Sequence, residues 1–370
     1  MRILLKLLFP ILLVYSSILY GQVEEQADTE EKIQPVDTKA VKRSAIPVVF
    51  FLPETSLGFG ATLINTVRQN DHSERTRTSQ YILSAAYTLK NQLLIFAPFE
   101  RYSNNNKDRL KGELGYYRFF YNFHGLGRNS DIANLEIYNV IFPRVDINYS
   151  RQFIPNTYFG VGLNFDAFNI TEIESDGILF REQPVGYLGG NKSNIYFLAA
   201  YDTRNNINAP SKGSYFEASF FQSLFSPLSD FDYNKYIVDL RKYFTVGKQK
   251  IVATQLFFAT ATEGTPFFDL PYVSTPILGR GLNDRRFINH TIVSAQTEFR
   301  THLWKRFYGA AFIGINSVPE ERWEWFTNPI LTYGVGIRYE IQPESNTKLR
   351  FDVAAGDGSF NFYFTVNESF

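Results

Sequence analysis

From residue 45 onward, apolar and polar residues alternate in runs of roughly ten residues, and helical periodicity is almost absent. The stretch 360–370, FNFYFTVNESF, shows the alternation most cleanly. Successive side chains of a strand point to opposite faces, so the pattern predicts a β-strand with one apolar face and one polar face. The apolar face would carry Phe360, Phe362, Phe364, Val366 and Phe370, interrupted only by Glu368.

Charged residues gather on the polar faces of the segments 293–301, 331–341 and 349–356. A soluble β-sandwich would also alternate, but its polar faces would lie outside. Here the apolar faces are broad and aromatic, and the polar faces carry charges of both signs. This favours a barrel with a lipid-facing exterior and a wet lumen. The side chains expected to face the lumen and to pair there are Glu298, Arg300, Arg338, Glu340, Arg350 and Asp352.

Segments of this kind follow one another about sixteen times, and the connections between them alternate in length. Connections after even-numbered segments are mostly short (SNNNKD, QFIPN, VGKQK, WKRF), whereas the long ones, such as 264–287, follow odd-numbered segments. This is typical of an outer-membrane barrel with both ends in the periplasm. The sequence predicts an all-β fold, a transmembrane antiparallel β-barrel of about 16 strands. The segments are 45–52, 57–68, 77–89, 92–102, 108–121, 134–151, 156–171, 192–203, 213–224, 232–246, 249–263, 288–303, 307–315, 330–342, 348–356 and 360–370.

The first 44 residues lack this pattern. Residues 1–21 have a short basic start, an apolar core and a small residue at the end, which predicts a secretory signal peptide rather than a membrane anchor. Residues 22–44 are charged and nearly free of large apolar side chains, so we expect a disordered periplasmic lead-in. The barrel is expected over 45–370, in the outer membrane of a Gram-negative bacterium.

Composition narrows the function classes. The formal net charge is zero, so no nucleic-acid partner is expected. Cysteine is absent, which excludes disulfides, cysteine-ligated zinc and thiol catalysis. Aromatic residues reach 17%, yet mean hydropathy is −0.19, as expected when apolar and polar positions alternate. We expect no metal, no cofactor and no enzymatic activity, because no nucleophile, base and orienting group converge and the four histidines are scattered at 72, 124, 290 and 302.

The stretch 278–287, LGRGLNDRRF, lies between the eleventh and twelfth segments. It lacks the Lys-Ser/Thr of a phosphate-binding loop, and composition alone would make it an ordinary external loop. However, Gly279 and Gly281 give the backbone freedom on both sides of Arg280. An arginine carried into the lumen would need a carboxylate, because a partly buried unpaired charge is costly. Glu298, Asp352 and Glu340 are the inward-facing candidates, the first two being favoured.

Several motifs in order resemble the BamA/TamA-type outer-membrane assembly superfamily, also called the bacterial surface antigen family. Arg280-Gly281 resembles the family's Arg-Gly-aromatic motif, with Leu282 in the aromatic position. AQTEFR (295–300) resembles the family's twelfth strand, and FYGAAFIGINSV (307–318) its thirteenth, here without the aspartate that many members carry. YDTRNNINAPSKGSYFEAS (201–219) resembles the element entering the ninth strand. Its Asp202 and Arg204 could form a catalytic pair, but a turn-stabilising pair is favoured.

The resemblance implies a loop folded back into the lumen as a plug, formed by Gly279, Arg280, Gly281 and Leu282. It also implies a C-terminal assembly signal in Phe362, Phe364, Val366 and Phe370. The family's assembly members carry periplasmic POTRA domains, for which 22–44 is too short, so a POTRA-less member is expected. The implied function is insertion or translocation of outer-membrane protein or lipid, with outer-membrane lipid and periplasmic or outer-membrane proteins as partners. A passive pore, or a surface-structural or docking barrel without insertase activity, is the alternative.

Overall fold

The computed structural model describes residues 41–52, 56–67, 76–103, 105–320, 324–325, 327–343 and 346–370. The chain divides into two compact units, Met1–Asp37 and Thr38–Phe370, and the described residues all belong to the second. The predicted signal peptide, and the lead-in up to residue 40, lie outside the described residues. Within those residues, no helix is long and apolar enough to cross a membrane.

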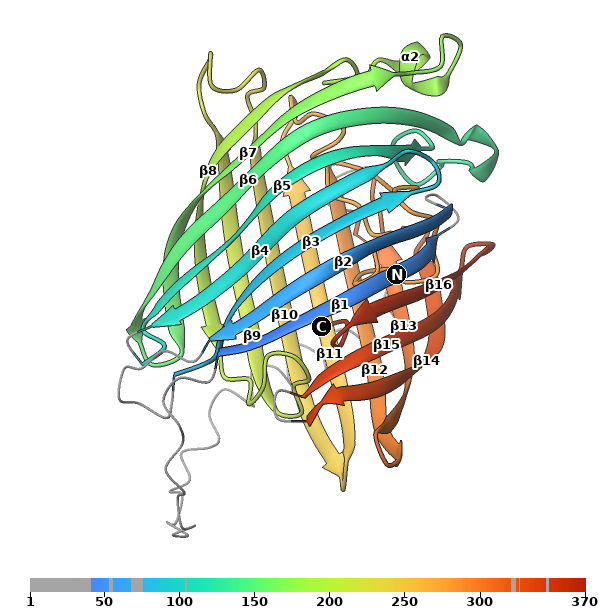
Figure 1. The fold of residues 1–370 in the computed structure, drawn as a ribbon. Coiled ribbons are helices and arrows are strands. Elements are labelled where there is room, and N and C mark those ends of the chain that lie inside the picture. The colour runs from blue at the N-terminus through green and yellow to red at the C-terminus, as the bar shows by residue number, and fades with distance from the viewer. Residues whose placement is uncertain are drawn as a thin grey trace. The chain divides into compact units, whose positions relative to one another are not determined.

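Sixteen strands form one antiparallel sheet in which every strand pairs with its neighbours in the sequence (Figure 1). β1 and β16 are its edge strands, and no pairing joins them within the described part of the chain. The first eight strands are β1 Val41–Leu52, β2 Ser56–Val67, β3 Ser79–Thr88, β4 Leu93–Ser103, β5 Asp108–Phe123, β6 Glu136–Ile154, β7 Thr157–Glu172 and β8 Gly189–Asp202. The others are β9 Gly213–Ser223, β10 Asn234–Gly247, β11 Lys250–Ala261, β12 Thr291–Trp304, β13 Phe307–Ser317, β14 Ile330–Gln342, β15 Thr347–Gly356 and β16 Ser359–Val366.

The predicted strand number and order are confirmed, and the boundaries differ most at the two ends of the sheet. β1 begins at Val41, within the predicted lead-in, because 41–44 pair with Ile64 to Val67 of β2. β16 ends at Val366, four residues before the end of the predicted strand. Backbone pairing with a neighbouring strand, which alternation of side chains does not report, decides both limits.

The outer face of the sheet is apolar. On β14, Leu331, Tyr333, Val335 and Ile337 are between 50% and 60% exposed, whereas the next residue, Arg338, is fully buried. A row of exposed large apolar side chains is unfavourable in water, because each costs roughly 1.5–3 kcal/mol relative to burial. Lipid removes that cost. The polar lining and apolar exterior are those of a transmembrane barrel.

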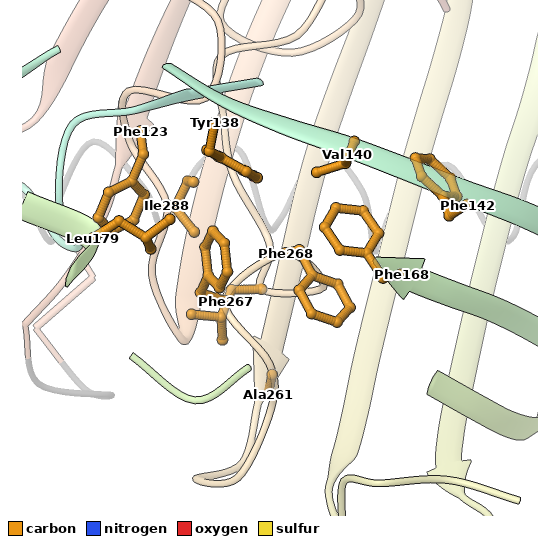
Figure 2. Close-up of a cluster of buried hydrophobic side chains, with 11 residues drawn as sticks. Phe123, Tyr138, Val140, Phe142, Phe168, Leu179, Ala261, Phe267, Phe268 and Ile288 are labelled. Atoms are coloured by element: carbon orange, nitrogen blue, oxygen red, sulfur yellow. The ribbon is translucent and has the colours of Figure 1, made fainter. Parts of the chain in front are cut away.

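Residues of two long loops and of the neighbouring strands form a buried aromatic cluster (Figure 2). The loop 262–290 between β11 and β12 contributes Phe267 and Phe268, and the ring of Phe268 stacks on Phe168 of β7 at 4.0 Å. The loop between β7 and β8 contributes Leu179 from the short helix α2 (Ile178–Glu182), and the loop between β5 and β6 contains a 3-10 turn, η2 (Ile132–Asn134). Inward residues of β5 and β6 complete the cluster: Phe123, Tyr138, Val140 and Phe142.

Candidate functional site

Two glycines shape the backbone around Arg280. Gly279 has φ +60° and Gly281 has φ +107°, conformations that other L-residues rarely adopt. A Cβ added at Gly281 would stand 2.6 Å from a backbone carbon of Ala355 on β15. The Gly281 N–H donates to the Tyr363 hydroxyl of β16 at 2.9 Å. The tripeptide therefore lies directly against the inner wall at β15 and β16.

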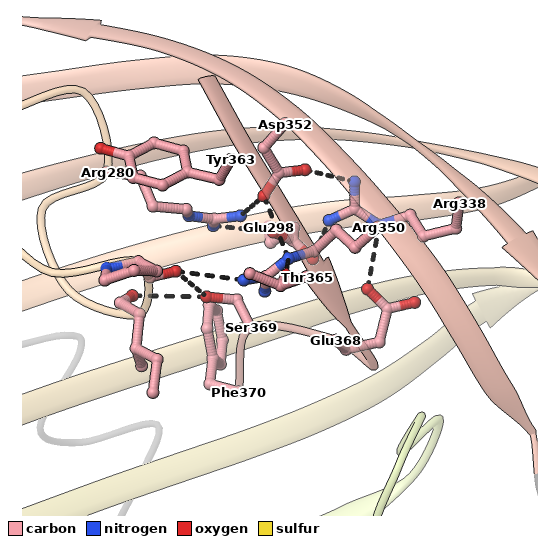
Figure 3. A network of polar contacts seen from close by, with 12 residues as sticks. Arg280, Glu298, Arg338, Arg350, Asp352, Tyr363, Thr365, Glu368, Ser369 and Phe370 are labelled. Atoms are coloured by element: carbon pink, nitrogen blue, oxygen red, sulfur yellow. Dashed lines mark hydrogen bonds and ion pairs between the residues drawn. The ribbon is translucent and has the colours of Figure 1, made fainter. Parts of the chain in front are cut away.

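This placement carries the Arg280 guanidinium into a site between two carboxylates (Figure 3). Its Nη2 is 2.7 Å from Glu298 of β12, and its Nη1 is 2.7 Å from Asp352 of β15. The guanidinium also lies over the Phe312 ring of β13, 3.5 Å from its centroid. Both favoured carboxylates of the sequence prediction thus contact Arg280. Phe312 is on the thirteenth strand, and its ring supplies a cation–π contact to Arg280.

Three further arginines complete a buried ionic cluster with these groups (Figure 3). Arg338 of β14 bridges Asp352 and Glu298, the latter at 3.3 Å. Arg300 contacts Glu298 at 2.7 Å, and Arg350 approaches Asp352 at 3.5 Å. Glu298, Arg338 and Asp352 are fully inaccessible to solvent. Removing one partner would leave a buried charge unpaired, so the cluster stabilises one arrangement of loop and wall strongly over others.

The segment after β16 turns into the lumen and joins this cluster. Glu368 contacts Arg338 at 3.0 Å and Arg300 at 3.6 Å, and Lys348 also lies within 3.6 Å. Burial alone would raise the pKa of the Glu368 carboxyl, but Arg300 and Arg338 hold that pKa below its usual range. The predicted outward position of Glu368 is therefore wrong. The sequence did contain one indication of this, because Glu368 interrupts an otherwise apolar face.

Phe370 likewise lies inside. It is 3% exposed and packs with Tyr243 and Ala253, below the Arg300 guanidinium. The Ser369 hydroxyl donates to loop carbonyls at Pro276 and Ile277. The prediction that Phe370 shares the outward face of Phe362, Phe364 and Val366 is therefore wrong, because the chain leaves the strand after Val366 and follows Glu368 inward. Those three residues do face outward and are 37–57% exposed.

The loop 262–290 is also attached to other strands of the wall. Asp269 accepts hydrogen bonds from Lys192 of β8 at 3.0 Å and from Lys235 of β10 at 2.7 Å. Burial alone would raise the pKa of Asp269, but the two lysines hold it well below its usual range. Arg285, with φ +54°, places its guanidinium within 5 Å of the centroids of two rings, Tyr121 of β5 and Tyr272 of the loop. Sequence reasoning singled out neither attachment, because each depends on which distant strands face the loop.

Other predicted residues lie elsewhere. Glu340, near the end of β14, is half-buried, and no ion pair joins it to Arg280 in the described residues, because Arg280 lies against β12 and β15. Asp202 and Arg204 form a two-point ion pair at 2.9 and 3.0 Å, as a turn-stabilising role requires. Arg77 adds a third contact to Asp202 at 2.8 Å. Among the described residues no cluster of histidine and carboxylate side chains suits a metal.

An outer-membrane barrel whose lumen holds a loop tied to its wall is the class of protein that this fold and site define. The model of the Omp85 superfamily domain matches residues 62–370, and the chain belongs to the Omp85 superfamily. No curated protein sequence matches it significantly. The described residues form the barrel and its loops, and no module of the POTRA type lies among them.

Solved structures with the same fold share little sequence with the chain. BamA from Haemophilus ducreyi lacking POTRA domains 1–3 has a TM-score of 0.57 and 13% identity, over 90% of this chain and 69% of the BamA chain. CdiB from Acinetobacter baumannii has a TM-score of 0.53 and 12% identity, over 89% of this chain and 65% of the CdiB chain. These likenesses confirm the barrel fold.

Proposed function

We propose that this protein is a non-enzymatic assembly or translocation component of the outer membrane, acting on outer-membrane protein or lipid. The observation that carries the proposal is the attachment of loop 262–290 to the lumen wall at two places, Arg280 and Asp269. A loop held by buried charges at two places suits a barrel that works through its wall better than a barrel that conducts solutes through its lumen.

The edge strands of the sheet supply the working surface in this proposal. Pro47 lies within β1 opposite Ala61 of β2, and proline has no backbone N–H to donate to a ladder. On the other side, β16 ends at Val366 because the following residues are held inside by Glu368. A short edge and a proline-bearing edge make a weak seam, at which another strand or a lipid could enter the wall.

The proposal is tested by reconstituting the purified protein in liposomes and measuring insertion of a urea-unfolded outer-membrane barrel, with protein-free liposomes as the baseline. The chain has no cysteine, so in a variant with one cysteine in β1 and one in β16 no other thiol competes for the disulfide. We expect faster insertion with the reduced protein than with the oxidised one. Equal insertion by both forms and by empty liposomes would contradict the proposal. A steady open conductance in planar bilayers would instead support a passive pore.

A further inference from the structure

Four basic side chains lie together on two neighbouring turns at the end of the barrel where its short connections lie. The turn between β10 and β11 carries Lys248 and Lys250, and the turn between β12 and β13 carries Lys305 and Arg306. The turns are adjacent, because the His302 N–H donates to the Gln249 carbonyl at 3.2 Å. We call these four residues the basic turn patch. All four are exposed, and within the described residues none takes part in an ion pair.

The basic turn patch has no acidic counterpart nearby on the same turns. The local sequences are VGKQK at 246–250 and LWKRF at 303–307, without Asp or Glu. This contrasts with the lumen, where every arginine around Glu298 and Asp352 shares a carboxylate. Glu340 of β14 lies beside Arg306, because its N–H donates to the Arg306 carbonyl at 2.9 Å, but no ion pair joins it to the patch in the described residues, and the turns keep a net positive charge. Such a patch attracts a negatively charged partner.

Apolar and aromatic side chains place the patch at a membrane surface. Trp304 is 57% exposed and stacks on Phe307, with ring centroids 5.0 Å apart, and Lys305 Nζ lies 5.5 Å from the Trp304 ring. Phe307 packs in turn on outward-facing Tyr339, whose ring centroid is 5.1 Å away. Trp and Tyr concentrate where the hydrocarbon meets the headgroups. The ammonium groups beside this aromatic row therefore lie at headgroup level.

Two lysines on the outer face extend toward the same level. Lys250 pairs with Thr301 and shares the outward face with Leu256, so its stem begins on the lipid side. Lys242, further along β10, donates to the Ser214 hydroxyl at 2.8 Å, near the start of β9 at this end of the barrel. A lysine rooted on the lipid face and directed to the rim is the arrangement called snorkelling.

We propose that the basic turn patch binds the phosphate of an anionic phospholipid headgroup in the periplasmic leaflet. The charge selects an anion, and the adjacent Trp304, Phe307 and Leu303 receive the acyl chains that a free anion or a soluble acidic protein lacks. The inference depends on the outer-membrane location and not on the proposed assembly activity, so either can fail without the other.

The test uses the full chain in non-ionic detergent micelles, titrated with phosphatidylglycerol or phosphatidylcholine and observed by native mass spectrometry. The variant is Lys248→Gln with Lys305→Gln, and the matched control removes two exposed charges at the other end, Lys90→Gln with Arg181→Gln. Each basic residue near a charged surface contributes about 1 kcal/mol, so the patch variant should bind phosphatidylglycerol at least about tenfold more weakly. The control should bind like the wild type, and a Lys248→Arg, Lys305→Arg variant should retain affinity. Added salt should weaken binding by the wild type.

Four results would overturn the proposal. Equal affinity of the wild type for both lipids would remove the headgroup selectivity. An equal loss in the patch variant and in the control would make the effect one of net charge alone. Displacement of the lipid by millimolar inorganic phosphate, with phosphate then bound at the same turns, would assign a free-anion site. Cross-linking from the turns to an acidic periplasmic protein, lost in the patch variant without lipid preference, would assign a protein partner instead.

Discussion

Arg280 reaches two carboxylates from two strands, Glu298 of β12 and Asp352 of β15, while its planar face covers Phe312. A guanidinium suits this site because its fork of donors can serve two acceptors at once, whereas an ammonium is a single point charge. The sequence indicated the arginine, its flanking glycines and both carboxylates, since all follow from local motif and strand alternation. It could not indicate the ring contact, because that depends on how β13 stands relative to the loop.

Arg280→Ala should destabilise the barrel by about 3–5 kcal/mol, since it leaves Glu298 and Asp352 buried beside fewer cations. Arg280→Lys should lose less, because one ammonium can still pair with one carboxylate. The measurement is the temperature at which the folded band disappears on semi-native gels. Arg181→Ala, on exposed helix α2, is the control and should leave that temperature unchanged. An unchanged profile for Arg280→Ala would count against a structural role for the cluster.

Gly281→Ala tests the backbone independently of charge. The substitution combines a positive φ with a Cβ 2.6 Å from the Ala355 backbone, so loop or strand must shift. We expect a destabilisation of at least about 1–3 kcal/mol, seen as a lower midpoint of unfolding in guanidinium chloride. Gly247→Ala meets only the Lys250 side chain at ordinary contact distance and serves as the control. Similar midpoints for the two variants would show that the close approach at Gly281 is not restrictive.

At the scale of the element, β16 shows where the alternation of apolar and polar residues no longer predicts which way a side chain faces. Phe360, Phe362, Phe364 and Val366 follow the predicted outward face, whereas Glu368 and Phe370 lie inside. The alternation of apolar and polar residues indicates which side chains could face lipid. Phe370 is apolar, so it could face lipid or pack beside Tyr243, and the alternation does not decide between these positions. Ion pairing of Glu368 with Arg338 and Arg300 decides between the two, and those partners come from other strands.

The Glu368 contacts make the stability of this end of β16 depend on pH. The pKa of Glu368 is lower in the folded protein than in the unfolded chain, where it is near 4.3. The stability that its ion pairs contribute is therefore fully present above the unfolded-state pKa and is lost as pH falls through the folded-state pKa. The difference in unfolding free energy between wild type and Glu368→Gln should therefore be largest at neutral pH and shrink below about pH 4. Denaturant titrations at pH 7 and at pH 3 measure it. A difference that stays constant between these pH values would rule out ionised Glu368 as the cause.

At the scale of the whole molecule, strand number, order and the alternation of turns and loops were predictable, because lipid outside and water inside impose one period on every strand. The contacts that the long loops make with the barrel wall were not predictable. Phe168 and Phe268 stack across a separation of 100 positions in the chain, and Asp269 meets lysines of β8 and β10. Aromatic residues are so frequent in this sequence that the sequence does not indicate which two of them stack on each other.

Two ionic attachments of one loop predict a graded conductance. Asp269→Asn weakens the attachment to Lys192 and Lys235, and Arg280→Ala weakens the attachment to β12 and β15. Each alone should give brief, infrequent openings in planar bilayers, because the other attachment keeps the loop in the lumen. The double variant should give a sustained conductance. Asp176→Asn, on an exposed loop, is the control and should behave like wild type. A double variant as closed as the wild type would mean that the aromatic cluster alone seals the lumen.

The two attachments also involve different strands of the wall. Arg280 is tied to β12 and β15, and Asp269 and Arg285 are tied to β8, β10 and β5. If β1 and β16 part, the strands near β16 swing away from the strands that hold Asp269, and the loop must span the widening distance. The loop would then act as a tether whose length limits how far the wall can open, and whose tension pulls it closed again.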